Sequence, residues 1–286
     1  SMPETSTTIK SGSIVSPELP IEFINTGELD IKTTYVLPVT IKSVEGIGVL
    51  QSAKTYYYVF RGASLINVVC NISRNRAYPD FKNDSKFNNL TENTMEILFK
   101  ANSFPNTLNT LMGIESNYLL RIGDATIPNN QLQVATSVNN CTSADLQLES
   151  GKWYHVAVAF NKGNVKVYIN GVEKLSGSTG KSSVSLGAKH TNEEDGSRCF
   201  WVGYSYKDDR YFDGVVSEVR IWNRALTAEE IQATNHFYTI EPESEGLIAY
   251  WKFDEGSGTV AKDYSVSGYD LTIEKEPKWE SVSLPQ

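Results

Sequence analysis

The densest concentration of aromatic and polar side chains in this 286-residue sequence lies between positions 200 and 213. Sugar recognition needs flat aromatic rings for the apolar faces of the sugar and planar polar groups for its hydroxyls, and this segment supplies both. The Lys-Asp-Asp-Arg sequence at 207–210 predicts an exposed tip flanked by rings that face a ligand. The alternative is that Trp201 and Phe212 belong to the core. In that case only Tyr204, Tyr206 and Tyr211 are partly exposed. The candidate ligand-binding residues in this segment are Tyr204, Tyr206, Asp208, Asp209, Arg210 and Tyr211.

A second candidate site consists of two charges in an otherwise apolar strand pair at residues 113–124. Arg121 and Asp124 either pair with each other as a structural ion pair or line a concave polar face. In the second case they join the candidate ligand-binding residues.

The sequence contains no recognisable catalytic constellation. The carboxylate cluster at 193–196 is typical of a solvated turn in a polar loop. The three histidines, His155, His190 and His236, are scattered, and His155 is expected to be a satisfied core or edge residue. No nucleophile elbow or phosphate-binding loop is present. These observations favour binding over turnover, although distant residues can assemble an active site.

The three cysteines fit no zinc-binding spacing. We expect Cys70, Cys141 and Cys199 to be partly buried free thiols. A Cys141–Cys199 disulfide would require an oxidising compartment and closely spaced Cα atoms.

The net charge of −8 and the sequence pI near 5.1 argue against a nucleic-acid partner, because such proteins usually present a basic face. No apolar run approaches the roughly 18 residues of a membrane-spanning helix. The first residues are polar and show no signal peptide. Ser1 and Met2 resemble a remnant of an expression tag, so the sequence is compatible with an export signal that has been removed.

Strand patterns dominate the chain and predict an all-β sandwich. Residues 151–172 form three short strand patterns joined by two turns, and Asn170-Gly171 is a strong hairpin signal. Thr227 and Glu230 stand at capping-box spacing and predict one short helix. Further strand-like runs lie at 94–100, 108–114, 118–122, 131–135, 246–253, 271–273 and 279–282.

The composition divides the chain into three parts. Residues 1–14 are polar and predict a flexible leader. Residues 15–72 predict a small, partial β domain with strands at 19–23, 35–41 and 55–60. A stretch rich in Asn, Arg, Lys and Asp follows, and residues 73–286 are assigned to the sandwich.

Three segments, 151–172, 214–231 and 246–263, together resemble the laminin-G-like, concanavalin A-like jelly roll. The segment that begins at Trp251 opens such domains but lies near the end of this chain. We therefore expect the tail to supply sandwich strands in a permuted order, or else to begin a second, truncated copy.

The resemblance also bears on chemistry. Retaining hydrolases on this fold carry a Glu-x-Asp-x-x-Glu motif, which this sequence lacks. Related sandwiches hold calcium with loop carboxylates, so calcium is a candidate cofactor. The candidate calcium ligands are Asp124, Asp208, Asp209 and Asp213.

Residues 13–60 resemble the second half of a domain of unknown function that begins many surface lipoproteins of gut anaerobes, through the runs at 34–41 and 54–59. Proteins that pair this domain with a laminin-G-like domain are similar to surface glycan-binding proteins that serve outer-membrane glycan importers. The resemblance implies a lipoprotein at the cell surface whose contact with the membrane is a lipid anchor. It implies a glycan ligand, with host N-glycans or mannose-rich chains as first choices.

The expected function is non-catalytic carbohydrate binding. Two alternatives stay open: a glycoside hydrolase on this fold, which would show two close carboxylates in a cleft, and an adhesion or scaffold module, which would show a flat apolar patch.

Overall fold

A computed structural model describes residues 2–24, 29, 33–61, 66–190 and 198–285. The chain divides into two compact units, Ser1–Leu65 and Ile66–Gln286, and each is described by itself. The expected boundary after residue 72 lies later than this division. The reason is that strand β3 (Ile66–Asn71) pairs with strands far along the second unit, a long-range contact that a local composition change does not reveal. None of the described helices is long and apolar enough to cross a membrane.

The first unit contains an antiparallel ribbon of β1 (Thr34–Thr40) and β2 (Thr55–Arg61), with the 3₁₀ turn η2 (Gln51–Ala53) before β2. The expected strand at 19–23 does not form, since these residues have no regular secondary structure. Phe23 instead packs its ring 4.9 Å from that of Phe60. The ribbon leaves many apolar side chains exposed, among them Val36, Tyr56, Tyr57 and Val59.

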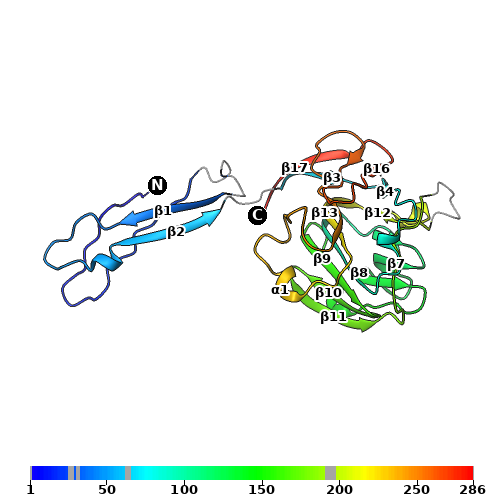
Figure 1. Cartoon of the computed structure of the whole chain (residues 1–286), viewed down its shortest axis with the longest axis horizontal. Helices are drawn as coiled ribbons and strands as arrows, with labels where there is room; N and C mark the ends of the chain where they lie inside the picture. The colour runs from blue at the N-terminus through cyan, green and yellow to red at the C-terminus, as the bar shows by residue number, and fades with distance from the viewer. Residues whose placement is uncertain (1, 25–28, 30–32, 62–65, 191–197, 286) are drawn as a thin grey trace. The chain divides into compact units, whose positions relative to one another are not determined.

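The second unit is a sandwich of two antiparallel sheets (Figure 1), so the predicted all-β architecture is confirmed. In the described part of the chain, the eight-stranded sheet has the order β11 (Val172–Ser178), β10 (Asn164–Ile169), β9 (Trp153–Asn161), β5 (Glu92–Ala101), β13 (Gly214–Trp222), β3 and β17 (Lys278–Leu284), and β14 (Leu247–Trp251) also pairs with β13. The seven-stranded sheet has the order β15 (Val260–Ala261), β16 (Leu271–Ile273), β4 (Ala77–Pro79), β12 (Trp201–Val202), β6 (Asn109–Ile114), β7 (Tyr118–Asp124) and β8 (Ile127–Thr136). The inner faces of both sheets contribute to one hydrophobic core.

The expected hairpin between β10 and β11 is present. Asn170 and Gly171 have φ values of 48° and 77°, which are the left-handed conformations that such a two-residue turn requires. The turn therefore fixes the register of the strands at this edge of the sheet.

Alternation along β5 decides which side chains enter the core. Met95, Ile97 and Phe99 face the other sheet, so Glu96 and Leu98 lie on the outer face. A segment at residues 223–246 covers this outer face and contributes Leu226, Ile231 and Phe237 to a second cluster. The covering segment includes the short helix α1 (Ala228–Ile231), which begins with the predicted capping box of Thr227 and Glu230.

The tail of the chain supplies strands to both sheets. β14 pairs with β13 and β17 with β3, whereas β16 pairs with β4 in the opposite sheet. The structure therefore agrees with a tail that completes the sandwich and excludes a separate truncated copy.

Candidate functional site

The seven-stranded sheet carries a row of aromatic side chains on the face turned away from the core. Val202 of β12 belongs to the core, so its neighbour Trp201 points to the opposite face. The ring centroid of Trp201 lies 5.3 Å from that of Tyr78 and 5.1 Å from that of Tyr204. Tyr204 in turn lies 5.0 Å from Tyr211. We call these residues, together with Tyr206 of the same loop, which contacts Arg210, the aromatic strip: Tyr78, Trp201, Tyr204, Tyr206 and Tyr211.

Two arginines lie over the rings of the strip. The guanidinium of Arg76 is 5.0 Å from the ring centroid of Trp201 and 4.5 Å from that of Tyr204. The guanidinium of Arg210 is 4.4 Å from the ring centroid of Tyr206 and donates a hydrogen bond of 3.2 Å to its hydroxyl. Cation–π contacts of this kind fix the orientation of both partners.

An ion pair anchors the loop that carries the strip. Arg210 belongs to the 3₁₀ turn η5 (Asp208–Arg210), and its Nη1 lies 3.1 Å from Oε2 of Glu115 in the turn between β6 and β7. Its Nε is buried and has no hydrogen-bond partner among the described residues. The loop therefore holds a cationic side chain that is only partly satisfied by the protein.

The structure brings together Tyr204, Tyr206, Arg210 and Tyr211 of the candidate ligand-binding residues. Tyr206, Arg210 and Tyr211 are half-buried and Asp209 is exposed, whereas the side chain of Asp208 lies outside the described part of the structure. Tyr204 differs from the expectation, because it is only 2% exposed beneath its aromatic neighbours. Trp201 is also 2% exposed and Phe212 is a core residue, as in the alternative interpretation.

Arg121 and Asp124 form an ion pair. Nη2 of Arg121 lies 2.5 Å from Oδ2 of Asp124, and both Nε and Nη2 donate hydrogen bonds to Oε1 of Gln133 on β8. Arg121 lies on the outer face of β7, since Leu120 and Ile122 are core residues. It is 7% exposed, so a structural role accounts for it.

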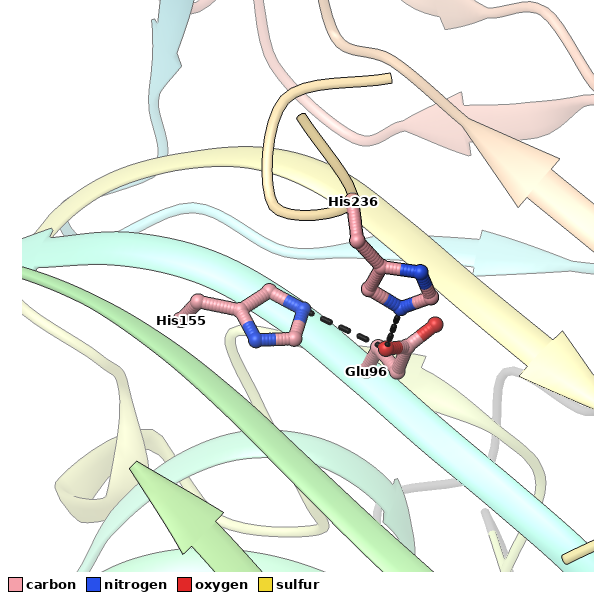
Figure 2. Close-up of side chains that lie close together, drawn as sticks. All are labelled: Glu96, His155 and His236. Carbon is pink, nitrogen blue, oxygen red and sulfur yellow. Dashed lines mark hydrogen bonds and ion pairs between the residues drawn. The ribbon is translucent and has the colours of Figure 1, made fainter. Parts of the chain in front are cut away.

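A second group of polar residues, which the sequence did not identify as a unit, lies on the outer face of the other sheet. Figure 2 shows Glu96 of β5, His155 of β9 and His236, which follows α1, pointing toward one another. Oε1 of Glu96 lies 2.6 Å from Nε2 of His236 and 3.3 Å from Nε2 of His155. All three side chains are buried, and His236 is contributed by the covering segment itself.

Neighbouring side chains support this group. Nε1 of Trp222 donates a hydrogen bond of 2.6 Å to Oε2 of Glu96. Arg220 lies 3.7 Å from the same oxygen and also pairs closely with Glu218. The hydroxyl of Tyr250 donates a hydrogen bond of 2.6 Å to Glu218. The result is a continuous polar network through an otherwise apolar layer.

The environment shifts the ionisation of this network. Burial opposes ionisation of Glu96, but its contacts with His155 and His236 and the charge of Arg220 outweigh burial and hold the pKa of Glu96 well below its usual value. Burial lowers the pKa of His155 and outweighs the opposing effect of Glu96. Glu96 is therefore ionised and His155 is neutral near pH 7.

One feature of the sequence could have pointed to the group formed by Glu96, His155 and His236. Glu96 interrupts the apolar run of β5, and a carboxylate in a strand that is buried on both faces needs partners. Its partners come from positions far along the chain, so their identity required the sheet topology. The expectation that His155 is a satisfied core histidine is only partly met, because neither ring nitrogen has a hydrogen-bond partner among the described residues.

The donor atoms of Glu96, His155 and His236 all lie within 4.8 Å of one another, and no other group of three or more such side chains is found in the described residues. The expected calcium ligands do not converge. Asp124 pairs with Arg121, and Asp213 accepts hydrogen bonds from Ser73 and Ser103. Asp209 is exposed, and the Asp208 side chain is outside the described part of the chain.

The cysteines are buried in the described part of the chain, and the considered Cys141–Cys199 disulfide is not formed. Sγ of Cys199 instead lies 3.3 Å from Nδ1 of His190. Burial raises the pKa of both Cys70 and Cys141, which leaves these thiols protonated. The carboxylate cluster at 193–196 lies outside the described residues.

Comparison with known proteins places the fold. The Laminin_G_3 model, described as the concanavalin A-like lectin/glucanases superfamily, matches residues 75–232, and a model described as an N-terminal domain matches residues 1–48. No curated protein matches the chain. A crystal structure from Bacteroides ovatus, provisionally described as that of a carbohydrate-binding protein, is 27% identical, with 89% of this chain and 70% of that chain covered and a TM-score of 0.69.

Two further solved structures are more distant. A pentraxin from Limulus polyphemus is 15% identical over 60% of this chain and 82% of that chain, with a TM-score of 0.42. Domain 4 of an arabinanase from Geobacillus stearothermophilus is 19% identical over 75% of this chain and 91% of that chain, with a TM-score of 0.45. The resemblance to the laminin-G-like jelly roll is confirmed by the family match over residues 75–232, and the chain belongs to the concanavalin A-like lectin/glucanases superfamily.

Proposed function

We propose that this protein captures glycan chains without cleaving them. The observation that carries the proposal is the aromatic strip, with its two arginines, on the outer face of the seven-stranded sheet. The Bacteroides ovatus structure, at 27% identity and a TM-score of 0.69, supports a carbohydrate ligand through its own description.

The exposed part of the strip has the chemistry that a sugar requires. Tyr206 and Tyr211 are half-buried, so parts of their rings remain available for the apolar face of a sugar. Arg210 and Asp209 lie beside them and offer a donor and an acceptor for hydroxyl groups. Tyr204 and Trp201 act beneath them as a rigid support, since both are buried. Such a shallow site binds weakly at each contact and gains from repetition along a polymer.

Hydrolysis is the less favoured function. It would require two carboxylates that reach the bond to be cleaved. Glu96 and Glu218 are brought together by Arg220, but they are 0% and 2% exposed. Glu115, near the aromatic strip, is paired with Arg210. These carboxylates serve structural contacts, which supports capture over cleavage.

We further propose that the protein acts at the bacterial cell surface as a lipoprotein and delivers its ligand to an outer-membrane glycan importer. The separate N-terminal domain match at residues 1–48 and the Bacteroides relative support this placement. Host N-glycans and mannose-rich chains are the first ligands to test. Protease treatment of intact cells that produce the native protein would check its location, since an internal protein would survive the treatment.

The central experiment is affinity electrophoresis of the full chain in gels containing yeast mannan, together with an array of N-glycans. Retarded migration is expected for the wild type. Tyr206→Ala and Tyr211→Ala should each weaken binding by about tenfold, which corresponds to about 1.4 kcal/mol for a lost stacking contact. Tyr57→Ala, which removes an exposed tyrosine of the first unit, is the matched control and should bind as the wild type does.

A reducing-sugar assay on the same glycans separates the alternatives. New reducing ends would refute non-catalytic capture and establish a hydrolase. A protein that neither binds the glycans nor releases reducing ends would favour a scaffold module. One observation supports a scaffold module as the second candidate function. Tyr56, Tyr57 and Val59 of the first unit are 67%, 61% and 65% exposed, as the side chains of an apolar docking face would be.

A further inference from the structure

Three side chains of metal-ligand type meet on the outer face of the eight-stranded sheet, the sheet opposite to the aromatic strip. They come from separate places: β5 for Glu96, β9 for His155, and the covering segment at 223–246 for His236. One carboxylate oxygen and two imidazole nitrogens lie within 4.8 Å of one another (Figure 2). This donor set is independent of the residues assigned to glycan binding.

The surroundings of these donors are buried and charged. The fully buried Arg220 lies 3.7 Å from Oε2 of Glu96 and also pairs with Glu218. One guanidinium therefore serves two carboxyl groups, and Oε1 of Glu96 is left to the two histidines. Buried charged groups are costly unless they are paired or coordinate a metal.

The donors are held in position by other contacts. Trp222 binds Oε2 of Glu96, which leaves Oε1 directed at the two histidines. Nη1 of Arg220 donates a hydrogen bond of 2.7 Å to the backbone carbonyl of His236. Ligands of bound metals are commonly oriented by such outer contacts.

His155 provides a second, independent observation. Its ring stacks on Phe237 with centroids 4.5 Å apart, and its side chain is completely buried. Neither of its nitrogens has a hydrogen-bond partner among the described residues, although Nε2 is directed at Glu96. A buried imidazole nitrogen directed at a carboxylate oxygen, without a well-formed hydrogen bond between them, is an arrangement that a shared cation would complete.

We propose that Glu96, His155 and His236 bind a divalent transition-metal ion, with zinc as the first ion to test. Two imidazoles and one carboxylate suit zinc and its neighbours, whereas calcium and magnesium prefer oxygen donors only. Zinc–nitrogen and zinc–oxygen distances of about 2.0–2.2 Å need only small adjustments of side chains that already converge. The ion fastens the covering segment to the sheet, and because its ligands are buried, it enters as the protein folds.

The competing explanation is that a proton fills the same role. A direct hydrogen bond between Nε2 of His236 and Oε1 of Glu96, which lie 2.6 Å apart, would hold the two side chains together without a metal. Metal measurements on the unaltered protein distinguish these cases without any substitution.

The first experiment uses the full wild-type chain produced with zinc in the medium and dialysed against metal-free buffer. Elemental analysis should find close to one zinc ion per chain. The protein refolded with cobalt(II) should show visible d–d absorption of a low-coordinate site with nitrogen ligands. Removal of the metal by unfolding and refolding with a chelator should lower the melting temperature, and zinc present during refolding should restore it.

Variants then locate the ion. His236→Gln should lose the zinc and the cobalt spectrum. Trp222→Phe removes the contact to Oε2 of Glu96, together with part of a buried ring, and should weaken metal affinity by about 10–100-fold. His190→Gln is the matched control, because it replaces the remaining histidine of the chain, which contacts Cys199, and it should retain the full zinc content.

Wild-type protein that is free of metal, gives no cobalt spectrum and melts at the same temperature with or without zinc would overturn the proposal. Loss of zinc in His190→Gln with retention in His236→Gln would also overturn it, since the ion would then lie at Cys199. Affinity electrophoresis in glycan-containing gels provides a separate readout, because it tests the aromatic strip and not the metal site. Zinc-depleted protein that remains folded should still bind the glycan.

Discussion

Nε2 of His236 lies 2.6 Å from Oε1 of Glu96, although 140 positions separate the two residues in the sequence. This contact ties the covering segment at 223–246 to a central strand of the eight-stranded sheet. It is accompanied by the hydrogen bond from Arg220 to the His236 backbone. The covering segment is thus held by polar contacts as well as by the apolar cluster around Leu226 and Ile231.

The hydroxyl of Tyr250 can be tested as part of this network. Tyr250→Phe keeps the ring, which lies 5.1 Å from the Arg220 guanidinium. It removes the hydrogen bond to Glu218 and a longer one that the hydroxyl accepts from the backbone N–H of Ile240. Loss of a buried hydrogen bond to a charged group should lower the free energy of unfolding by about 1.5–3 kcal/mol. Urea unfolding would measure this, with Tyr238→Phe as a half-buried control. Equal stability of both variants would show that Glu218 does not depend on this donor.

Two glycines provide a matched test of backbone packing. Gly113 in β6 has φ of +120°, and an added Cβ would lie 2.4 Å from the carbonyl oxygen of Tyr118. Gly151 also has a positive φ of +77°, but an added Cβ would meet nothing within 4 Å. Gly151→Ala should therefore cost only the strain of about 1–2 kcal/mol, whereas Gly113→Ala should cost clearly more. Thermal unfolding of the two variants side by side gives the difference, and equal costs would contradict the close approach of β6 to β7 at this position.

The capping box of α1 predicts a loss of stability that is smaller than that of Gly113→Ala. Thr227 accepts a hydrogen bond from the backbone of Glu230, and the Glu230 side chain accepts one from the backbone of Thr227. Thr227→Ala should lower the free energy of unfolding by about 1 kcal/mol. The exposed Ser257→Ala should change it by less than about 0.5 kcal/mol. Denaturant titration of both variants measures the contrast, and no loss in Thr227→Ala would show that the cap is dispensable.

The environment of Asp213 predicts that part of the stability of the fold is lost in acid. Burial would raise its pKa, but hydrogen bonds from Ser103, Ser73 and Asn102 outweigh burial and lower it. A carboxyl whose folded pKa is depressed stabilises the fold above its unfolded value of about 3.9, and this stabilisation is lost as the pH falls through the folded value.

The stability difference between wild type and Asp213→Asn should therefore be largest near neutral pH and shrink below about pH 4. Urea unfolding across this range measures it. Ser257→Ala, which alters an exposed side chain that does not ionise in this range, is the control and should show no such trend. A difference that stays constant down to about pH 3 would contradict the assignment.

Local patterns predicted the parts of the fold that depend on local physics. The Asn170-Gly171 turn and the Thr227 cap are set by backbone conformation and short-range hydrogen bonds, and both form as expected. The sandwich class followed from alternating strands. The run at 19–23 was a wrong prediction, because β propensity alone does not supply a neighbouring strand to pair with.

The functional residues were less predictable. The clustering of Tyr206, Arg210 and Tyr211 follows from their closeness in sequence. The burial of Tyr204 also depends on Arg76, which immediately precedes β4 and lies far away in the sequence. The grouping of Glu96, His155 and His236 depends on strand order and on the path of the covering segment. Neither is encoded in any local spacing.

The pairing of β3 with β17 has a consequence for how the protein is made. Ile66 lies opposite Leu284, so the first strand of the second unit to leave the ribosome must wait for β17 to pair with it. Until β17 has been synthesised, one edge of β3 has no neighbour and the sheet is incomplete. An unpaired strand edge is where a chaperone, or a like strand from another nascent chain, would attach, and the pairing of β17 closes it.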